Sequence, residues 1–395
     1  MTTTTNNEQK KLNVPNLRFK EFQGEWEKKR LEECVEFLDG LRKPIKSEDR
    51  KSEQGLYPYY GASGIIDYID GYIFDGEYIL LSEDGANIID RNYRVAFIAK
   101  GKIWVNNHAH VLQPYDGFDI NFLSETLERL NYAVYNTGTT MPKLNQEVCR
   151  NINLKIPTTI EQNKIGNLLS LLNERIATQN KIIDKLQSLI KGLNNHLCQQ
   201  HGNEIETSFA DLGVSYSGLS GKTAADFGSG KPFITYLNVY SNNVIDETSY
   251  QYVRMGNNEK QSIVRYGDVL FTLSSETPEE VGIGSVYLGN QEVYLNSFCF
   301  GIHITNTQKS FSPYLSYYIS TTQFRKFIYP FAQGSTRFNL CKADFEKATI
   351  KLPTLENQKR IYKALKSLSD KIMVEKATLE QYSRQKQYLL RQMFI

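Results

Sequence analysis

The chain has 395 residues, which is too many for one ordinary core and favours two or three domains. Hydrophobic residues make up 40% and charged residues 23%, which excludes a largely disordered chain, a collagen-like repeat and a disulfide-stabilised miniprotein. With 46 basic and 44 acidic side chains the formal net charge is only +2, so an anionic partner would have to be met by local basic patches.

The N-terminal residues are polar and lack the apolar core of a secretory signal. No run approaches the ~18 apolar residues that a membrane helix needs. The five cysteines are scattered without a Cys-x-x-Cys pair, so neither a disulfide framework nor a structural zinc site is expected. These features predict a cytoplasmic protein that does not enter a membrane.

The first globular region is predicted over residues 14–156, after a flexible tail over residues 1–13. Short runs of β-branched and aromatic residues between glycine and Asp-Gly turns predict strands. An apolar helical period predicts a helix over Ile120–Leu130. The predicted strands are Tyr57–Tyr60, Glu77–Ser82, Val95–Ala99 and Ile103–Val105.

A long amphipathic helix is predicted over residues 157–200, with Pro157 at its start and Thr158 and Glu161 in a capping-box pattern. Its apolar residues recur at alternating spacings of three and four, which is the a/d seam of a coiled coil. The seam consists of Leu169, Leu172, Ile176, Ile183, Leu186, Ile190, Leu193 and Leu197, with the polar Gln179 among them.

The second globular region, predicted over residues 201–352, repeats this organisation. Its predicted strands are Phe233–Val239, Asp268–Leu273, Gly284–Leu288 and Phe298–Ile304, and its predicted helix is Pro313–Phe327. A second amphipathic helix over residues 353–395 carries Leu365, Leu368, Ile372, Leu379 and Leu389 in its seam, with Glu375 and Lys386 as polar interruptions. Those interruptions predict that the end of the coiled coil is loose or covered by partners.

A common offset relates the two halves, and it drifts by a few residues upstream, where Val105-Asn106 pairs with Leu295-Asn296. Gly138-Thr139-Thr140 returns as Gly334-Ser335-Thr336, and 334 − 138 = 196; the same offset carries Gln162 onto Gln358 and one seam onto the other. Solenoid repeats are only ~20–50 residues long, so this is a duplicated domain. An amphipathic stripe usually packs into the core of its own domain, but a long stripe that occurs twice in one register favours a mutual coiled coil. The predicted fold is α+β, with two similar mixed α/β domains joined by two long antiparallel coiled-coil helices.

No catalytic set is recognisable in the sequence. The loop Gly218–Thr223 has Tyr216 where a phosphate-binding P-loop needs a glycine. His108 and His110 could share one face of a strand, but no third ligand accompanies them, and His108 more plausibly meets solvent or a base edge. Nucleophile-elbow, dinucleotide and amino-methylation motifs are absent from the sequence. We therefore expect a non-catalytic chain that itself binds no metal or cofactor.

Basic and amide side chains in loops are instead the candidates for DNA contacts, because cations bind phosphates while Arg, Asn and Gln read base edges. Most individual lysines on such a list would be merely solvated. In the paired Gly-Thr-Thr and Gly-Ser-Thr turns, small hydroxyl residues and a following cation suit close approach to a phosphate, although a structural turn explains them equally well. The candidates are Arg42, Lys43, Lys46, Arg91, Arg94, Asn106, Asn107, His108, Thr139, Thr140, Lys143, Lys222, Arg254, Lys260, Arg265, Ser335, Thr336, Arg337 and Asn339.

Motifs in a fixed order resemble those of type I restriction–modification specificity subunits. The chain opens with Asn16–Phe19, Glu25-Trp26 and Leu31, and each Gly-(Thr/Ser)-Thr turn is followed by Ile-Pro or Leu-Pro and then by Glu-Gln or Asn-Gln. No single motif is specific, but their repetition covers essentially the whole chain. The resemblance implies a fold of two target recognition domains and two spacer helices.

The same resemblance implies a function. Each recognition domain would read one half of a bipartite DNA site, and the helix pair would set the gap and dock two methyltransferase subunits. Those partners would bind S-adenosylmethionine and methylate adenine, while restriction subunits would use ATP and Mg. The alternatives are a coiled-coil scaffold without DNA specificity and a stand-alone enzyme, which the missing catalytic motifs disfavour.

Overall fold

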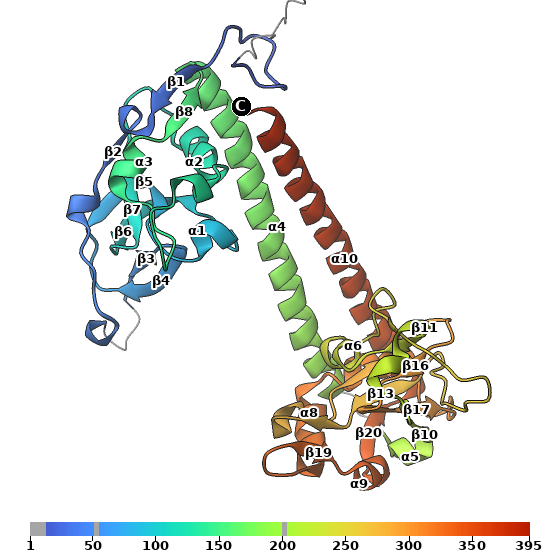
Figure 1. The fold of residues 1–395 in the computed structure, drawn as a ribbon. Helices are drawn as coiled ribbons and strands as arrows, with labels where there is room; N and C mark the ends of the chain where they lie inside the picture. The colour runs from blue at the N-terminus through green and yellow to red at the C-terminus, as the bar shows by residue number, and fades with distance from the viewer. Residues whose placement is uncertain (1–12, 51–54, 200–203) are drawn as a thin grey trace, which may run out of the picture. The chain divides into compact units, whose positions relative to one another are not determined.

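The computed structural model describes residues 13–50, 55–199 and 204–395, and the chain divides into two compact units. One comprises Met1–Asn180 with Ala377–Ile395, and the other comprises Lys181–Lys376. The long helices α4 (Thr159–Gln199) and α10 (Leu355–Gln392) each belong partly to both units (Figure 1). The predicted tail lies outside the described residues except for Asn13, whose carbonyl accepts a hydrogen bond from Trp26 N. None of the described helices is long and apolar enough to cross a membrane.

The first domain is built on a six-stranded sheet with the spatial order β2-β7-β5-β6-β3-β4. Its neighbouring strands are antiparallel except for the parallel pair β3 and β6. The strands are β2 (Val35–Phe37), β3 (Tyr57–Gly61), β4 (Gly64–Ile69), β5 (Phe74–Ser82), β6 (Ala96–Val105) and β7 (Ala109–Pro114), with β1 (Glu27–Arg30) and β8 (Asn153–Ile156) paired separately. The helices are α1 (Asn87–Asp90), α2 (Ile120–Glu128) and α3 (Gln146–Arg150).

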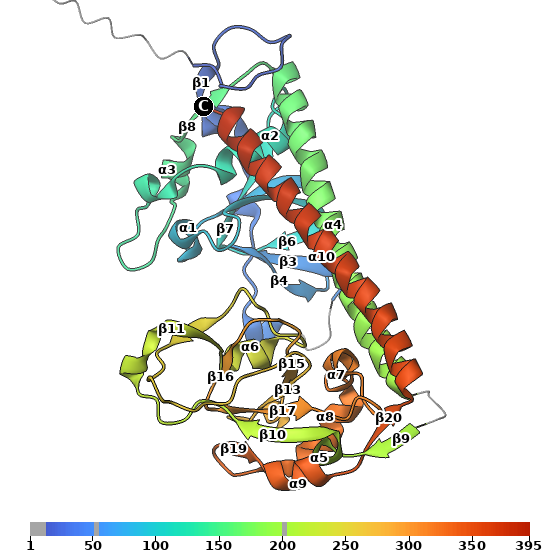
Figure 2. The same cartoon turned by 90° about the vertical axis from the view of Figure 1, so that its right-hand side faces the viewer.

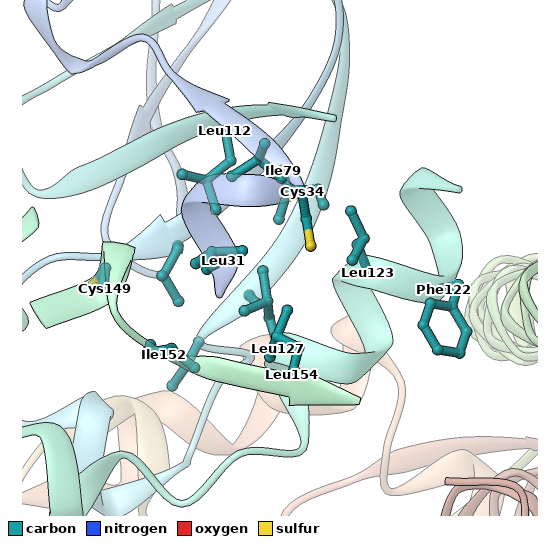
Figure 3. Packing of buried hydrophobic residues seen from close by; sticks show 14 of the residues in the cluster. Leu31, Cys34, Ile79, Leu112, Phe122, Leu123, Leu127, Cys149, Ile152 and Leu154 are labelled. Carbon is teal, nitrogen blue, oxygen red and sulfur yellow. The ribbon is translucent and has the colours of Figure 1, made fainter. Parts of the chain in front are cut away.

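The core of this domain lies between one face of the sheet and α2. Ile79 and Leu112 from the sheet pack with Phe122, Leu123 and Leu127 of the helix (Figure 3). Phe394, just beyond α10, stacks on Phe122 with ring centroids 5.3 Å apart. The end of the second long helix is therefore part of the first core.

The second domain divides its strands among four small sheets, with the orders β10-β17-β13-β15, β12-β11-β16, β14-β19-β18 and β20-β9 (Figure 2). The strands are β9 (Glu204–Thr207), β10 (Gly213–Ser217), β11 (Phe227–Ile234), β12 (Gln251–Val253), β13 (Val269–Thr272), β14 (Ser274–Ser275), β15 (Gly284–Val286), β16 (Tyr294–Leu295), β17 (Cys299–Ile304), β18 (Ala332–Gln333), β19 (Phe338–Leu340) and β20 (Ile350–Pro353). The helices are α5 (Phe209–Leu212), α6 (Tyr236–Ser241), α7 (Ser312–Tyr318), α8 (Thr322–Ile328) and α9 (Lys342–Lys347).

A buried glutamine repeats at the start of each long helix. Gln162 Oε1 accepts from the backbone N of Asp119 at 3.1 Å, and its Nε2 donates to the carbonyl of Pro157 at 3.0 Å. Gln358 Oε1 accepts from the backbone N of Phe311 at 2.8 Å, and its Nε2 donates to the carbonyl of Pro353 at 2.8 Å. Asp119 and Phe311 are the N-cap residues of α2 and α7, so equivalent residues connect helix and domain in both halves.

Four predicted elements differ from the structure in kind or in number. The strand predicted over Phe233–Val239 ends at Ile234, because the Thr235 side chain accepts from Asn238 N and starts α6. The helix predicted over Pro313–Phe327 is two helices, α7 and α8, and the Thr321 side chain caps the second of them. Val95–Ala99 and Ile103–Val105 are not separate strands, because β6 runs from Ala96 to Val105 through Gly101.

Within each unit the two long helices run antiparallel, and every predicted seam position is buried or half-buried. In the first unit the Arg175 guanidinium lies over the Tyr382 ring, 5.9 Å from its centroid. In the second unit Ile190, Leu193 and Leu197 pack against the core that contains Leu365. The stripe therefore also packs on the domain cores, as the simpler interpretation of such a stripe expects.

The N-terminal segment attaches to both long helices of the first unit. Arg18 forms a bidentate ion pair with Glu161, with N–O distances of 2.8 and 2.7 Å. The backbone N of Leu17 donates to the carbonyl of Gln392 at 2.8 Å. Glu161, which the sequence placed in a capping box, is thus fully buried as the partner of Arg18.

Lys386 does not leave the seam loose, which was one of the two predicted alternatives; the other, coverage by partners, stays a prediction. Its ammonium lies 3.0 Å from Glu125 Oε1, which Arg94 and Asn173 also approach at 2.9 and 3.0 Å. Glu125 is only 3% exposed. Burial alone would raise its pKa, but Arg94 and Lys386 together with the Asn173 hydrogen bond lower the pKa below its ordinary value.

We predict that Lys386→Met lowers the free energy of unfolding of the first unit by about 1–3 kcal/mol, because a buried carboxylate loses one charged partner. Adding Glu125→Gln to Lys386→Met should recover part of the loss, since the amide needs no counter-charge. Both tryptophans, Trp26 and Trp104, lie in the first unit, so urea unfolding followed by their fluorescence reports on this unit.

The exposed neighbour Gln385 supplies the control, and Gln385→Met should change the free energy by less than about 0.5 kcal/mol. The wild type should have a higher free energy of unfolding than Glu125→Gln above pH ~4.3, the pKa of an unfolded glutamate. This difference should disappear as the pH falls through the lower pKa of Glu125 in the folded protein. Equal effects of Gln385→Met and Lys386→Met would show that the ion pair contributes nothing.

Candidate nucleic-acid interface

Three of the candidate cations in the first domain are bound to carboxylates of the same domain. Arg42 pairs with Glu83 at 2.7 Å, and Arg94 pairs with Glu125 at 2.9 Å. Arg91 pairs with Glu128 at 3.2 Å. These arginines stabilise the domain, and their guanidinium groups are not free for phosphates in this conformation. Lys43, Lys46 and Asn107 are exposed, and Asn107 lies between the candidates Asn106 and His108.

Three segments of the first domain meet beside the end of β5. The backbone N of Glu83 donates to the carbonyl of His108 at 2.9 Å, and the backbone N of Leu144 donates to the carbonyl of Glu83 at 2.7 Å. Asp84 forms a β-bridge with Lys143. We call the residues Glu83-Asp84, His108 and Lys143-Leu144 the display frame of this domain. Two of the candidates, His108 and Lys143, thus lie together on it.

The second domain contains the same frame. The backbone N of Leu273 donates to the carbonyl of Phe298 at 2.8 Å, and the backbone N of Leu340 donates to the carbonyl of Leu273 at 2.8 Å. Ser274 pairs with Asn339 between β14 and β19. The display frame here is Leu273-Ser274, Phe298 and Asn339-Leu340. The first two segments follow their counterparts by 190 positions, and Asn339-Leu340 follow Lys143-Leu144 by 196, which is the offset of the paired turns.

A matching asparagine supports each frame. Asn106 N donates to the carbonyl of Tyr60 at 3.0 Å, and its side-chain oxygen accepts from His108 N at 2.8 Å. Asn296 N donates to the carbonyl of Ile234 at 3.0 Å, and its side-chain oxygen accepts from Phe298 N at 2.9 Å. Asn106 is buried, so its predicted DNA contact is corrected to a turn-forming role.

The buried His110 lies beneath the first frame. Its Nδ1 is 2.6 Å from Asp39 and its Nε2 is 2.8 Å from the carbonyl of Leu144, so both ring nitrogens face acceptors. Burial alone would lower the pKa of His110, but the Asp39 hydrogen bond and charge raise it to about 10. Asp39, Glu83 and His110 have ligand atoms within 4.8 Å of one another, yet Arg42 already supplies their positive charge. The hydrogen bonds and ion pairs of this cluster support the frame from beneath.

The backbone leaves no room for a side chain at the glycine of either paired turn. A Cβ on Gly138 would lie 1.8 Å from the carbonyl oxygen of Met141, and one on Gly334 would lie 2.1 Å from that of Arg337. The hydroxyl residues Thr139, Thr140, Ser335 and Thr336 are exposed on these turns. The cations, which the sequence treated as a pair, are not equivalent: Arg337 corresponds to Met141, while Lys143 corresponds to Asn339.

A hollow of about 350 Å³ adjoins the second frame. Its lining includes Tyr236, Leu237, Tyr240, Phe298 and Arg337. Phe298 is 54% exposed and Leu237 is 69% exposed, and the Arg337 guanidinium lies 5.6 Å from the centre of the Phe298 ring. Sequence reasoning missed these apolar residues because it searched for cations and amides. Phe298 is the first residue of the predicted strand Phe298–Ile304, where an aromatic residue carries no separate signal.

The remaining candidates of the second domain lie elsewhere. Lys222 pairs with Glu259 and donates to the carbonyl of Arg254 at 2.6 Å, so its ammonium is engaged. Arg254, Lys260 and Arg265 are exposed. They are not part of the display frame.

Comparisons with known proteins agree with the duplicated design. A family model described as the type I restriction modification DNA specificity domain matches residues 23–188 and again residues 222–382. The MjaVIII specificity subunit of Methanocaldococcus jannaschii is 23% identical over 407 residues, which cover 94% of each chain. A putative specificity subunit of Haemophilus influenzae, S.HindORF215P, is 36% identical over 148 residues, and the match spans 38% of this chain and 37% of that relative.

A solved S subunit from M. genitalium has a similar fold, with a TM-score of 0.61 at 15% identity and coverage of 97% of this chain and 99% of that one. This likeness concerns the fold, whereas the family model matches the sequence once in each repeat. The chain therefore belongs to the type I restriction–modification DNA specificity family and carries one specificity domain in each half.

Proposed function

We propose that this chain is the sequence-specific DNA-recognition subunit of a type I restriction–modification enzyme, with each domain reading one half of a bipartite duplex site. The observation that carries the proposal is the display frame, which repeats the same main-chain hydrogen bonds but presents different exposed side chains. Two recognition domains that share a scaffold but bind different half-sites need a constant main chain and different exposed side chains.

The long helices would set the distance between the half-sites and dock two methyltransferase subunits. Exposed aliphatic side chains such as Leu171, Leu189 and Met373 lie on these helices and suit partner contacts. S-adenosylmethionine for adenine methylation, and ATP and Mg for restriction subunits, would bind to those partners. The alternative of a coiled-coil scaffold without DNA specificity is not favoured, because it does not explain why the two display frames carry different side chains.

We expect the two recognition domains to act independently. Replacing the second recognition domain of a related subunit by residues 201–352 of this chain should change one half of the methylated motif and leave the other half intact. Methylation-aware sequencing of cellular DNA measures the motif, and the unmodified relative is the control. A change in both halves would contradict independent reading.

We also expect the helix pair to act as a spacer. Seven residues inserted into each helix preserve the heptad seam and add about 10 Å, or about three base pairs at 3.4 Å each. Both half-sites should persist, separated by more bases. An unchanged gap in the methylated motif would exclude the helices as the determinant of spacing.

Arg337 is expected to contact the phosphate backbone. Arg337→Ala should weaken binding equally for cognate and scrambled duplexes and reduce the log–log salt slope by roughly 0.9, as the loss of one phosphate contact does. The side chain is exposed, so folding should be unaffected. Affinities of the assembled methyltransferase over a salt series provide the test, and a loss limited to one base pair would contradict it.

A further inference from the structure

We infer that two exposed positions on each display frame determine which bases that domain prefers: His108 and Lys143 in the first domain, and Phe298 and Asn339 in the second. The third frame position supports them and is half-buried in the first domain (Asp84) and buried in the second (Ser274). The inference rests on the proposed function and identifies the residues and base edges involved. The first frame suits the acceptor edge of guanine. The second frame suits an A·T pair.

The positions qualify because the backbone holds them alike while their chemistry differs. In each domain two main-chain hydrogen bonds and one pair of bridged residues, Asp84 with Lys143 or Ser274 with Asn339, hold the three segments together. The side chain of Asn106 or Asn296 forms the turn that precedes β7 or β17. Leu144 and Leu340 are buried at the equivalent inner position. The leucine at this inner position is thus the same in both repeats of this chain, whereas Asp84, His108 and Lys143 are replaced by Ser274, Phe298 and Asn339.

The first frame presents hydrogen-bond donors. Lys143 is 46% exposed, and its ammonium pairs with Glu83 at 3.6 Å, which is longer than a hydrogen bond. His108 Nδ1 is 2.9 Å from Asp84 Oδ1, so the carboxylate orients the half-exposed ring. Guanine offers O6 and N7 as acceptors in the major groove, and lysine is among their usual partners. Lys143 is therefore the main reader here, and Asp84 positions His108 beside it.

The second frame presents an amide between apolar surfaces. Asn339 is exposed and occupies the position of Lys143, and an asparagine side chain matches N6 and N7 of adenine. Phe298 takes the place of His108, and Leu237 lies with it in the lining of the hollow. Their apolar surfaces suit the methyl group of thymine, which only an A·T pair carries into the major groove. The second domain has no lysine at this frame.

Exchange of the two equivalent side chains tests the inference. The variants Lys143→Asn and Asn339→Lys are made in the full chain, which is assembled with its methyltransferase subunits and used to select duplexes from a random library. The matched controls are Lys28→Asn and Asn290→Lys, which make the same exchanges at exposed positions outside the frames. Thermal unfolding verifies that all four variants are folded.

Lys143→Asn should reduce the preference for guanine at one position of a single half-site by about tenfold or more, and Asn339→Lys should do so for A·T in the other half-site. The controls should select the wild-type motif. Unchanged motifs in both frame variants, or losses spread evenly over all sequences, would overturn the assignment while leaving bipartite recognition in place. A wild-type complex that selects no motif would instead refute the proposed function.

Discussion

One buried glutamine side chain ties each long helix to its own domain, and the placement of everything else on that domain depends on it. Gln162 and Gln358 each connect the entry proline of a helix with the N-cap of a domain helix, α2 or α7. A buried amide that lost these partners would cost ~1–3 kcal/mol, so the junction resists bending. Because α2 and α7 also pack on the strands that lead to the display frames, packed elements connect each long helix with the frame of its own unit.

The contacts around this shared junction are not the same in the two halves. In the first unit Glu125 of α2 meets Asn173 and Lys386, whereas in the second unit the hydroxyl of Tyr317 meets Ser369 at 2.9 Å and Ile190 packs on the core. A buried carboxylate is stabilised by a nearby cation, whereas a cation buried in an aromatic core without such a partner would cost free energy of desolvation. The two helix ends are therefore not interchangeable, which fixes the antiparallel arrangement more firmly than two identical seams would.

Much of the architecture was predictable because its signals are local or periodic. The heptad spacing and the entry prolines are visible within short segments, and the repeat offset appears when the two halves of the sequence are compared. The two long helices follow from these signals. The errors concern elements whose ends depend on a single cap, such as Thr235 before α6 and Thr321 before α8. Likewise, Arg42, Arg91 and Arg94 looked like phosphate ligands, because their carboxylate partners lie 31 to 41 residues away in the sequence.

The sequence by itself determined that a domain is duplicated and that two register-matched helices accompany it, and it predicted the exposed polar loops as the binding surface. Only the tertiary structure decided which loop residues share a surface. His108 and Lys143 are distant in the chain, and Phe298 and Asn339 are as well, but hydrogen bonds between neighbouring strands bring each pair together. Such pairings depend on the register of neighbouring strands. The pattern of apolar and polar residues in the sequence does not specify this register where the residues on both faces are polar.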